Sequence, residues 1–271
     1  MEKMTLKEIQ ETDLNLMVEF DKVCRKYGLR YTLCAGSLIG AIRHEGFIPW
    51  DDDVDISMPR PDYEKLIRLN RKNNLFPDYM RLACFEDGTL DAPYMKIFDT
   101  RTRIKEEHYK QKDVSSLWID IFPVDGLPAS ERKTRFHYKI GMILVKLNII
   151  SVVKLGYGKS GLKIVLKAIF LRPLARLIGR KKIAKLQRKV ALKYSYNHSP
   201  RCGMVSWAYD GPGQVVEKEK YENLIEVPFE GHKFYSMKGY DEYLTGIFGD
   251  YMTPPPEEDR LTHELEAYYE G

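Results

Sequence analysis

The chain has 271 residues, of which 44% are hydrophobic, and a formal net charge of +4 at pH 7. This length fits one large domain or two small ones with an ample core. The four cysteines form no Cys-x-x-Cys pair and no regular spacing, which argues against structural zinc and indicates a reducing compartment. The polar N-terminus predicts no signal peptide, and the longest nearly apolar run, 140–155, is too short and too polar for a membrane span.

Periodicity of the apolar residues predicts the order of the elements. Residues 5–28 form an amphipathic helix that Gly28 closes. Other elements follow a central stretch at 31–58: a helix from Pro61, strands at 80–85, 94–98 and 117–122, a largely helical segment at 131–195, a hairpin at 227–234 and a helix at 240–248.

The central stretch begins with a predicted strand at 31–35. Gly36 and Ser37 then break the strand, and Ser37 is a good N-cap for the short helix that follows. Backbone N–H groups at the start of a helix are a common binding site for phosphate. This turn is therefore a candidate phosphate site.

Three carboxylates share one face of the next predicted strand. Because side chains alternate along a strand, one face carries Asp51, Asp53 and Asp55, while Asp52 points away. Neighbouring carboxylates repel one another and cannot all stay ionised without a cation, and carboxylate oxygens suit Mg²⁺ or Mn²⁺. Together with the turn, they predict a site for a metal-bound phosphate or nucleotide.

Two later strands carry further candidates. Asp120 lies among apolar residues, where a carboxylate is costly unless it is paired or metal-bound, so the alternatives are a salt-bridged structural Asp and a metal ligand. Lys96 is either a solvated lysine of an edge strand or a lysine that reaches a phosphate. Asp125, in a Pro-Val-Asp-Gly turn, is interpreted as structural.

The segment GSLIGAIRHEGFIPWDDDVDI closely resembles the signature of the LicD family. This family belongs to the nucleotidyltransferase-fold superfamily, marked by a Gly-Ser turn and an Asp-x-Asp strand. The resemblance extends to YMKIFDTRT, WIDIFPVDG and GYDEYLTGIFGDYMTPPPEEDR, and is weaker in the middle of the chain. It implies an α/β fold, with a nucleotidyltransferase-like mixed sheet flanked by helices and the carboxylates at the mouth of one sheet face.

The resemblance also implies an activity: metal-dependent transfer of phosphocholine, or a related phospho-alcohol, from CDP-choline to a hydroxyl of a cell-surface glycan or teichoic acid precursor, with release of CMP. Asp120 matches the third acidic residue of the superfamily's metal site. Mg²⁺ or Mn²⁺ would then be bound by Asp53, Asp55 and Asp120, with Asp51 as a further ligand. Asp120 is also the best candidate to orient or deprotonate the acceptor hydroxyl.

Substrate-binding residues are assigned in the same way. Gly36, Ser37, Arg43 and Lys96 are expected to contact the donor, and a carry-over from the family pattern adds His263 in the polar tail. Trp207 and Tyr209 could offer aromatic faces to a quaternary ammonium, although each residue alone is more often a core aromatic.

Residues 132–201 hold 19 Lys and Arg and no Asp or Glu, whereas the rest of the chain holds 24 basic and 39 acidic residues. Basic residues repeat every four residues in an amphipathic pattern, first at Lys163 and Lys167 and then at Arg172, Arg176 and Arg180. It indicates either a solvated helical face or docking to anionic lipid. Nucleic acid is disfavoured because aromatic residues do not alternate with the positive charges.

We therefore expect a catalytic core at 1–130, a basic helical insertion at 131–200 and a C-terminal region at 201–271 that completes the active site. The expected location is cytoplasmic, at the inner face of the membrane, with a lipid-linked acceptor. Four alternatives stay open: a nucleotidyltransferase that adds NMP to a small molecule or sugar, a glycosyltransferase with an Asp-x-Asp motif, a transferase of a polyol phosphate, and a non-enzymatic membrane-associated scaffold.

Overall fold

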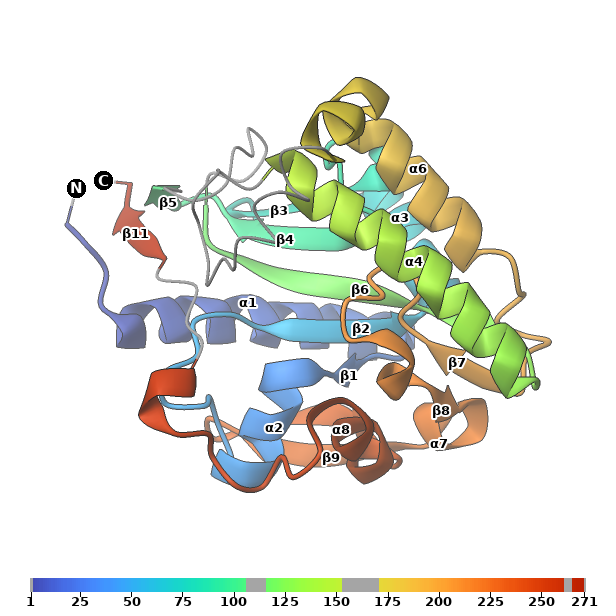
Figure 1. The fold of residues 1–271 in the computed structure, drawn as a ribbon. Helices are drawn as coiled ribbons and strands as arrows, with labels where there is room; N and C mark the ends of the chain where they lie inside the picture. Colours follow the sequence, from blue (N-terminus) through green and yellow to red (C-terminus); the bar gives the residue numbers. More distant parts are fainter. Residues whose placement is uncertain (1, 106–115, 153–170, 261–264, 271) are drawn as a thin grey trace.

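A seven-stranded mixed sheet lies at the centre of the computed structural model (Figure 1), which describes residues 2–105, 116–152, 171–260 and 265–270. Its main path runs in the order β1 (Thr32–Leu33), β2 (Asp55–Pro59), β6 (Trp118–Leu127), β4 (Met95–Asp99) and β3 (Met80–Cys84). Beyond this path, β6 pairs with β7 (Arg201–Gly203), which pairs with β8 (Val216–Glu217). Among the strands of the described ranges, β2 and β6 alone are parallel, so the mixed sheet expected from the sequence is confirmed.

Helices and two small strand pairs surround this sheet. The helices are α1 (Leu6–Tyr27), α2 (Ala35–His44), α3 (Arg60–Asn73), α4 (Glu131–Val152), α6 (Arg180–Ala191), α7 (Lys218–Glu222) and α8 (Tyr240–Phe248), with 3-10 turns at η1 (Phe85–Asp87), η2 (Gly211–Gln214) and η3 (Glu257–Asp259). A hairpin is formed by β9 (Leu224–Phe229) and β10 (His232–Met237), near its expected place. The second pair joins β5 (Thr102–Lys105) to β11 (Glu266–Tyr269).

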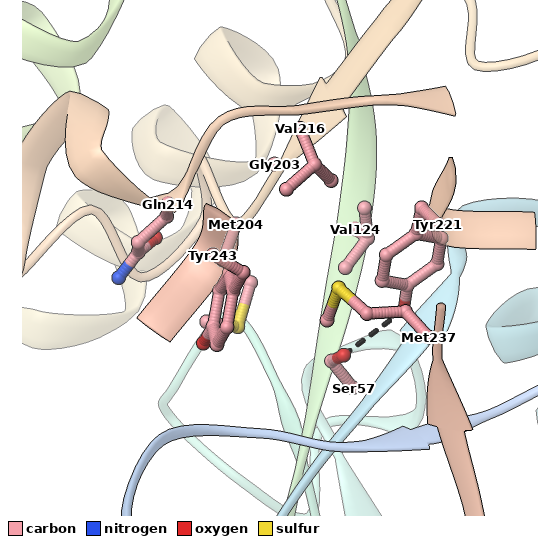
Figure 2. A pocket seen from close by; sticks show the side chains of 9 residues that line it. All are labelled: Ser57, Val124, Gly203, Met204, Gln214, Val216, Tyr221, Met237 and Tyr243. Carbon is pink, nitrogen blue, oxygen red and sulfur yellow. Dashed lines mark hydrogen bonds between the residues drawn. The ribbon is translucent and has the colours of Figure 1, made fainter. Parts of the chain in front are cut away.

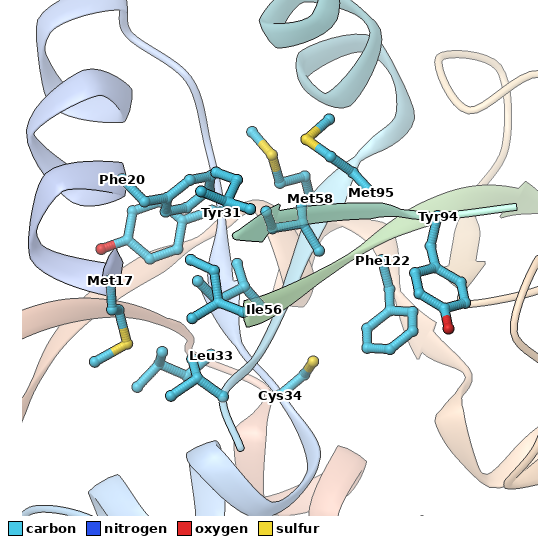
Figure 3. Close-up of a cluster of buried hydrophobic side chains, with 14 of the residues drawn as sticks. Met17, Phe20, Tyr31, Leu33, Cys34, Ile56, Met58, Tyr94, Met95 and Phe122 are labelled. Carbon is cyan, nitrogen blue, oxygen red and sulfur yellow. The ribbon is translucent and has the colours of Figure 1, made fainter. Parts of the chain in front are cut away.

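Helix α1 is built as its sequence predicts. Thr5 and Glu8 form a capping box at its start, and Gly28 ends it in the left-handed conformation, with φ of 58°. Its apolar face enters the main hydrophobic core, where Phe20 meets Tyr31 edge-on at a centroid distance of 5.2 Å. Figure 3 shows this part of the core beside Ile56 of β2. The core anchors β2 and its neighbours in the sheet.

The beginning of the central stretch differs from its prediction. The strand expected at 31–35 is reduced to Thr32–Leu33, and α2 already begins at Ala35, with Cys34 in the N-cap position. The assignment of Ser37 as the N-cap is therefore wrong, because Gly36 and Ser37 lie inside the first helical turn. The chain changes from the extended backbone of Cys34 to the helix at Ala35, which adopts a positive φ of 46°, uncommon for a residue other than glycine.

The basic segment is helical in α4, in residues 171–178 and in α6, whereas residues 192–200 form turns and bends after α6. Helices α4 and α6 run side by side on one flank of the molecule (Figure 1) and share a buried hydrogen bond from Asn148 to Gln187, 3.0 Å long. A small apolar cluster below them includes Tyr138, Val205 and Ala208. Lys163 and Lys167 lie outside the described residues.

The C-terminal region returns to the central sheet, because β7 pairs with β6 from Asp125 to Leu127. All four cysteines are buried and unpaired, as expected for Cys24 and Cys34. In the part of the chain that the structure describes, no helix combines the length and the apolar character that a bilayer crossing requires.

Candidate active site

Three charged side chains form a row across neighbouring strands. Asp55 of β2 pairs with Asp120 of β6, and Asp120 pairs on its other side with Lys96 of β4. Side chains of paired residues lie on the same face of a sheet, so the register brings these three groups together. The sequence placed Asp120 on a strand near the other acids, and the structure confirms that it neighbours Asp55.

Lys96 forms a buried ion pair with Asp120. Its Nζ lies 2.8 Å from Oδ1 and 3.0 Å from Oδ2 of the carboxylate, and the indole N–H of Trp118 also donates to Oδ2, over 2.9 Å. The ammonium lies 3.9 Å from the centre of the Trp118 ring and 5.5 Å from that of Tyr94. Lys96 is only 4% exposed, so the alternative of a solvated edge lysine is wrong.

Electrostatics at Lys96 reflect two opposing effects. Burial lowers the pKa of Lys96 most strongly, because a charged ammonium loses its hydration, while Asp120, Asp55 and Asp53 oppose that shift. The cation is thus held in an apolar setting by the carboxylates and by the ring of Trp118.

The acidic segment, residues 51–55, lies at the start of β2 and mostly precedes it. Strand β2 begins only at Asp55, so the prediction that Asp51 and Asp53 also lie on this strand is wrong. The burial of residues 51–54 still alternates: Asp51 and Asp53 are half-buried, whereas Asp52 and Val54 are buried. The carboxylate of Asp52 accepts a hydrogen bond from the amide of Leu265, 3.4 Å away. This alternation agrees with the prediction that Asp52 points away from its acidic neighbours.

A further acid, Asp13, lies behind this segment. It belongs to α1 and is 1% exposed, and its Oδ1 has no hydrogen-bond partner in the described part of the chain. Burial, followed by repulsion from Asp53 and Asp52, raises the pKa of Asp13 well above its usual range. Asp13 was not among the site residues predicted from the sequence. Its signal was its position four residues after Ile9, on the apolar face of the helix.

Helix α2 is held directly against the acidic strand. The hydroxyl of Ser37 accepts a hydrogen bond from the amide of Asp55, 2.8 Å away, so this side chain positions the strand. A Cβ at Gly36 would lie 2.8 Å from Oδ2 of Asp51, which explains the glycine. The first helical turn, whose amides have no partner within the helix, therefore borders the carboxylates.

Arg43 lies at the opposite end of α2. Its guanidinium donates to the backbone oxygen of Tyr251, 2.7 Å away, and to the ring of His44. This contact ties the helix to the C-terminal segment. A role for Arg43 in substrate binding stays a prediction.

Aromatic side chains gather beside Lys96. Tyr94 contacts Phe122 at 4.9 Å and Trp207 at 5.2 Å between ring centroids, so the C-terminal region brings Trp207 to the sheet face. Tyr209, in contrast, is 60% exposed. His263 lies outside the described residues.

Other charged candidates have structural partners. Asp125 lies within β6, so the turn expected there is wrong, but its buried ion pair with Arg60 agrees with its interpretation as structural. A cavity of about 10 Å³ lies further along the sheet (Figure 2), between β2, β6 and the C-terminal region, where Tyr221 and Ser57 share a hydrogen bond of 2.9 Å. It has room for about one water molecule, so a nucleotide or a choline group does not fit there.

The side chains of Asp53, Asp55 and Asp120, called the acidic row below, are of a kind that suits a magnesium ion. Asp53, Asp55 and Asp120 offer hard carboxylate oxygens, the ligands that Mg²⁺ and Mn²⁺ prefer. Among the described residues, no three His, Cys, Asp or Glu side chains already converge as metal ligands. Metal binding would thus require the carboxylates to approach one another and Asp120 to release an oxygen from Lys96.

Comparisons with known proteins identify the family of this chain. The family model "LicD/FKTN/FKRP, nucleotidyltransferase domain" matches residues 28–142, which include α2, the acidic segment and β6. The lipopolysaccharide cholinephosphotransferase LicD of Haemophilus influenzae is 34% identical over 275 residues, covering 99% of each chain. The chain therefore belongs to the LicD family.

Two further relatives are similar over a short stretch alone. The uncharacterized proteins RP689 of Rickettsia prowazekii and RT0683 of Rickettsia typhi are each 40% identical over 47 residues, or 17% of this chain. These matches cover 18% and 15% of the two rickettsial proteins. Similarity of this extent marks a shared motif and carries no information on their function.

Proposed function

We propose that this chain transfers phosphocholine from CDP-choline to a hydroxyl of a cell-surface glycan such as lipopolysaccharide, and releases CMP. The observation that carries the proposal is the Asp55–Asp120–Lys96 row, in a chain related over its whole length to a lipopolysaccharide cholinephosphotransferase. Membership of this family, together with that relative, makes the chain a phosphotransferase.

The carboxylates and the first turn of α2 would each have a role in this reaction. Mg²⁺ bound by Asp53, Asp55 and Asp120, with Asp51 as a further ligand, would supply positive charge to the diphosphate and to the departing CMP. The first turn of α2, at Gly36 and Ser37, offers amide donors to a phosphate. Asp120 is also placed to orient the acceptor hydroxyl or to take its proton.

The aromatic group beside Lys96 suits the choline end of the donor. Trp207 contacts Tyr94, whose ring lies beside Lys96, and a quaternary ammonium gains about 0.5–2 kcal/mol from an aromatic face. Tyr209 is exposed, so a contact with choline would need it to turn inward. We therefore assign Trp207 the larger share of head-group binding.

The basic segment suits a lipid-linked acceptor at an anionic membrane. Large apolar side chains stand exposed among its positive charges, namely Phe136, Ile143, Leu174, Leu177 and Leu186. Exposed apolar groups and basic residues together favour peripheral binding to anionic lipid, worth about 1 kcal/mol per basic residue near the surface. Sedimentation with anionic vesicles at low salt tests this proposal, because neutral vesicles or high salt should abolish the binding.

The activity is tested with a panel of CDP-alcohols, Mg²⁺ and lipopolysaccharide that lacks choline. We expect CMP release that depends on the acceptor, and an acceptor whose mass increases by phosphocholine. EDTA, Asp53→Asn and Asp55→Asn should each abolish turnover, whereas Glu11→Gln on the exposed face of α1 should not. Addition of a nucleotide to the acceptor would refute phosphocholine transfer and support a nucleotidyltransferase; preference for another CDP-alcohol would reassign the head group.

A further inference from the structure

The ammonium of Lys96 lies close to both oxygens of the Asp120 carboxylate, although only Oδ2 accepts a hydrogen bond among the described residues. Lys96 approaches Oδ1 at 2.8 Å, and Oδ2 accepts hydrogen bonds from Lys96 and from the indole of Trp118. The side chains of Lys96 and Asp120 are 5% and 13% exposed, so water screens this ion pair little. Asp120 is thus neutralised by a cation of the protein itself.

A divalent cation at Asp120 changes the position of Lys96. An ammonium 2.8 Å from a carboxylate oxygen would face the metal charge at close range, and the two cations would repel each other. A buried lysine that loses its anion is costly, so Lys96 requires a new anion nearby. A metal ion alone brings none, whereas a nucleotide diphosphate does.

The surroundings of Lys96 allow such an exchange. The ammonium lies 3.9 Å from the centre of the Trp118 ring, which attracts a cation whichever anion it contacts. Trp118 also keeps its own hydrogen bond to Oδ2, so one carboxylate oxygen stays oriented when the lysine moves. Oδ1 then changes from the ammonium to the metal, while Oδ2 loses the ammonium and keeps Trp118.

We propose that Lys96 is an internal counter-ion of Asp120 that hands the carboxylate to the metal and takes a diphosphate oxygen of the donor instead, so that metal and donor bind cooperatively. This inference rests on the proposed function, because it assumes a nucleotide diphosphate donor and a metal at Asp120. Linkage makes the effect reciprocal: the donor tightens metal binding by the same factor as the metal tightens donor binding.

The proposal predicts opposite effects from removal of the lysine. In Lys96→Met the acidic row lacks its internal cation, so Mn²⁺ alone should bind about tenfold more tightly than in the wild type. CDP should then increase Mn²⁺ affinity much less than it does in the wild type, because the ammonium that received the phosphate is gone. Lys96→Arg keeps a cation and should retain the weak binding of Mn²⁺ alone.

The experiment measures free Mn²⁺ by electron paramagnetic resonance during titration, with and without CDP. Lys22→Met serves as control, since Lys22 is an exposed lysine paired with Glu19 on α1. The double variant Lys96→Met/Asp120→Asn should lose the gain in affinity, which assigns the gain to Asp120. Circular dichroism checks that each variant is folded, and Lys96→Gln replaces Lys96→Met if the latter does not fold.

Unchanged or weaker binding of Mn²⁺ alone in the Met and Gln variants would overturn the proposal, as would an equal effect of CDP in variant and wild type. The measurement of Mn²⁺ alone needs neither choline nor acceptor, so it stands even if phosphocholine transfer is not observed. Conversely, phosphocholine transfer with no change in Mn²⁺ affinity would keep the proposed function and refute the exchange.

Discussion

The buried ion pair between Arg60 and Asp125 should contribute strongly to the stability of the packing between α3, β6 and the residues after β7. Nε of Arg60 lies 2.7 Å from Oδ1 of Asp125, and Nη2 lies 2.9 Å from Oδ2. Nη2 also donates to the hydroxyl of Ser206 over 3.0 Å. The two charged side chains are 6% and 1% exposed. This bidentate contact joins the start of α3 to β6 and to the residues after β7.

Replacement of one partner leaves the other charge buried and unpaired. We expect Arg60→Met or Asp125→Leu to lower the free energy of unfolding by about 3–5 kcal/mol each, whereas the double variant should lose much less than the sum. As a control, the exposed pair of Lys22 and Glu19, with 63% and 27% exposed side chains, should contribute less than about 1 kcal/mol.

Urea unfolding of the four members of the double-mutant cycle measures these free energies, with unchanged m-values as the sign of a common reference state. The reasoning is refuted if either single replacement costs less than about 1 kcal/mol at an unchanged m-value, or if the two effects simply add. An additive result would mean that the two charges are stabilised separately, against the geometry described above.

Two further predictions concern α4 and the C-terminal region. Burial of His137, followed by repulsion from Lys193, lowers its pKa below the ordinary value, so the unfolded chain binds the proton more tightly than the folded protein. The free energy of unfolding should then be highest above about pH 6.5 and should fall as the pH decreases below that value. Below about pH 6.5, the urea midpoint of His137→Phe should depend less on pH than that of the wild type. The urea midpoints of the control His198→Phe, at an exposed histidine, should match those of the wild type. Gly213→Ala should cost about 1–3 kcal/mol in thermal unfolding, because its Cβ would lie 2.1 Å from the backbone oxygen of Gly246 in α8; an unchanged Tm would contradict this close approach.

The sequence by itself determined the local features of the site. The capping box and Gly28 define α1, and strand-like alternation separates Asp51, Asp53 and Asp55 from Asp52. Asp120 was visible as a carboxylate in an apolar strand. Each of these signals lies within a few residues, since caps and strand alternation depend on local backbone geometry.

Only the tertiary structure decided which of these groups meet. The partner of Lys96 follows from the register of β4 against β6, and one residue of slip would place the lysine on the opposite face. Trp207 contacts Tyr94 because β7, which follows the basic segment in the sequence, pairs with β6 and so brings the next residues to the central sheet. Asp13 meets the acidic segment because α1 packs against the sheet. These contacts depend on long-range packing, in which the apolar faces of distant segments are buried together, and no local pattern specifies them.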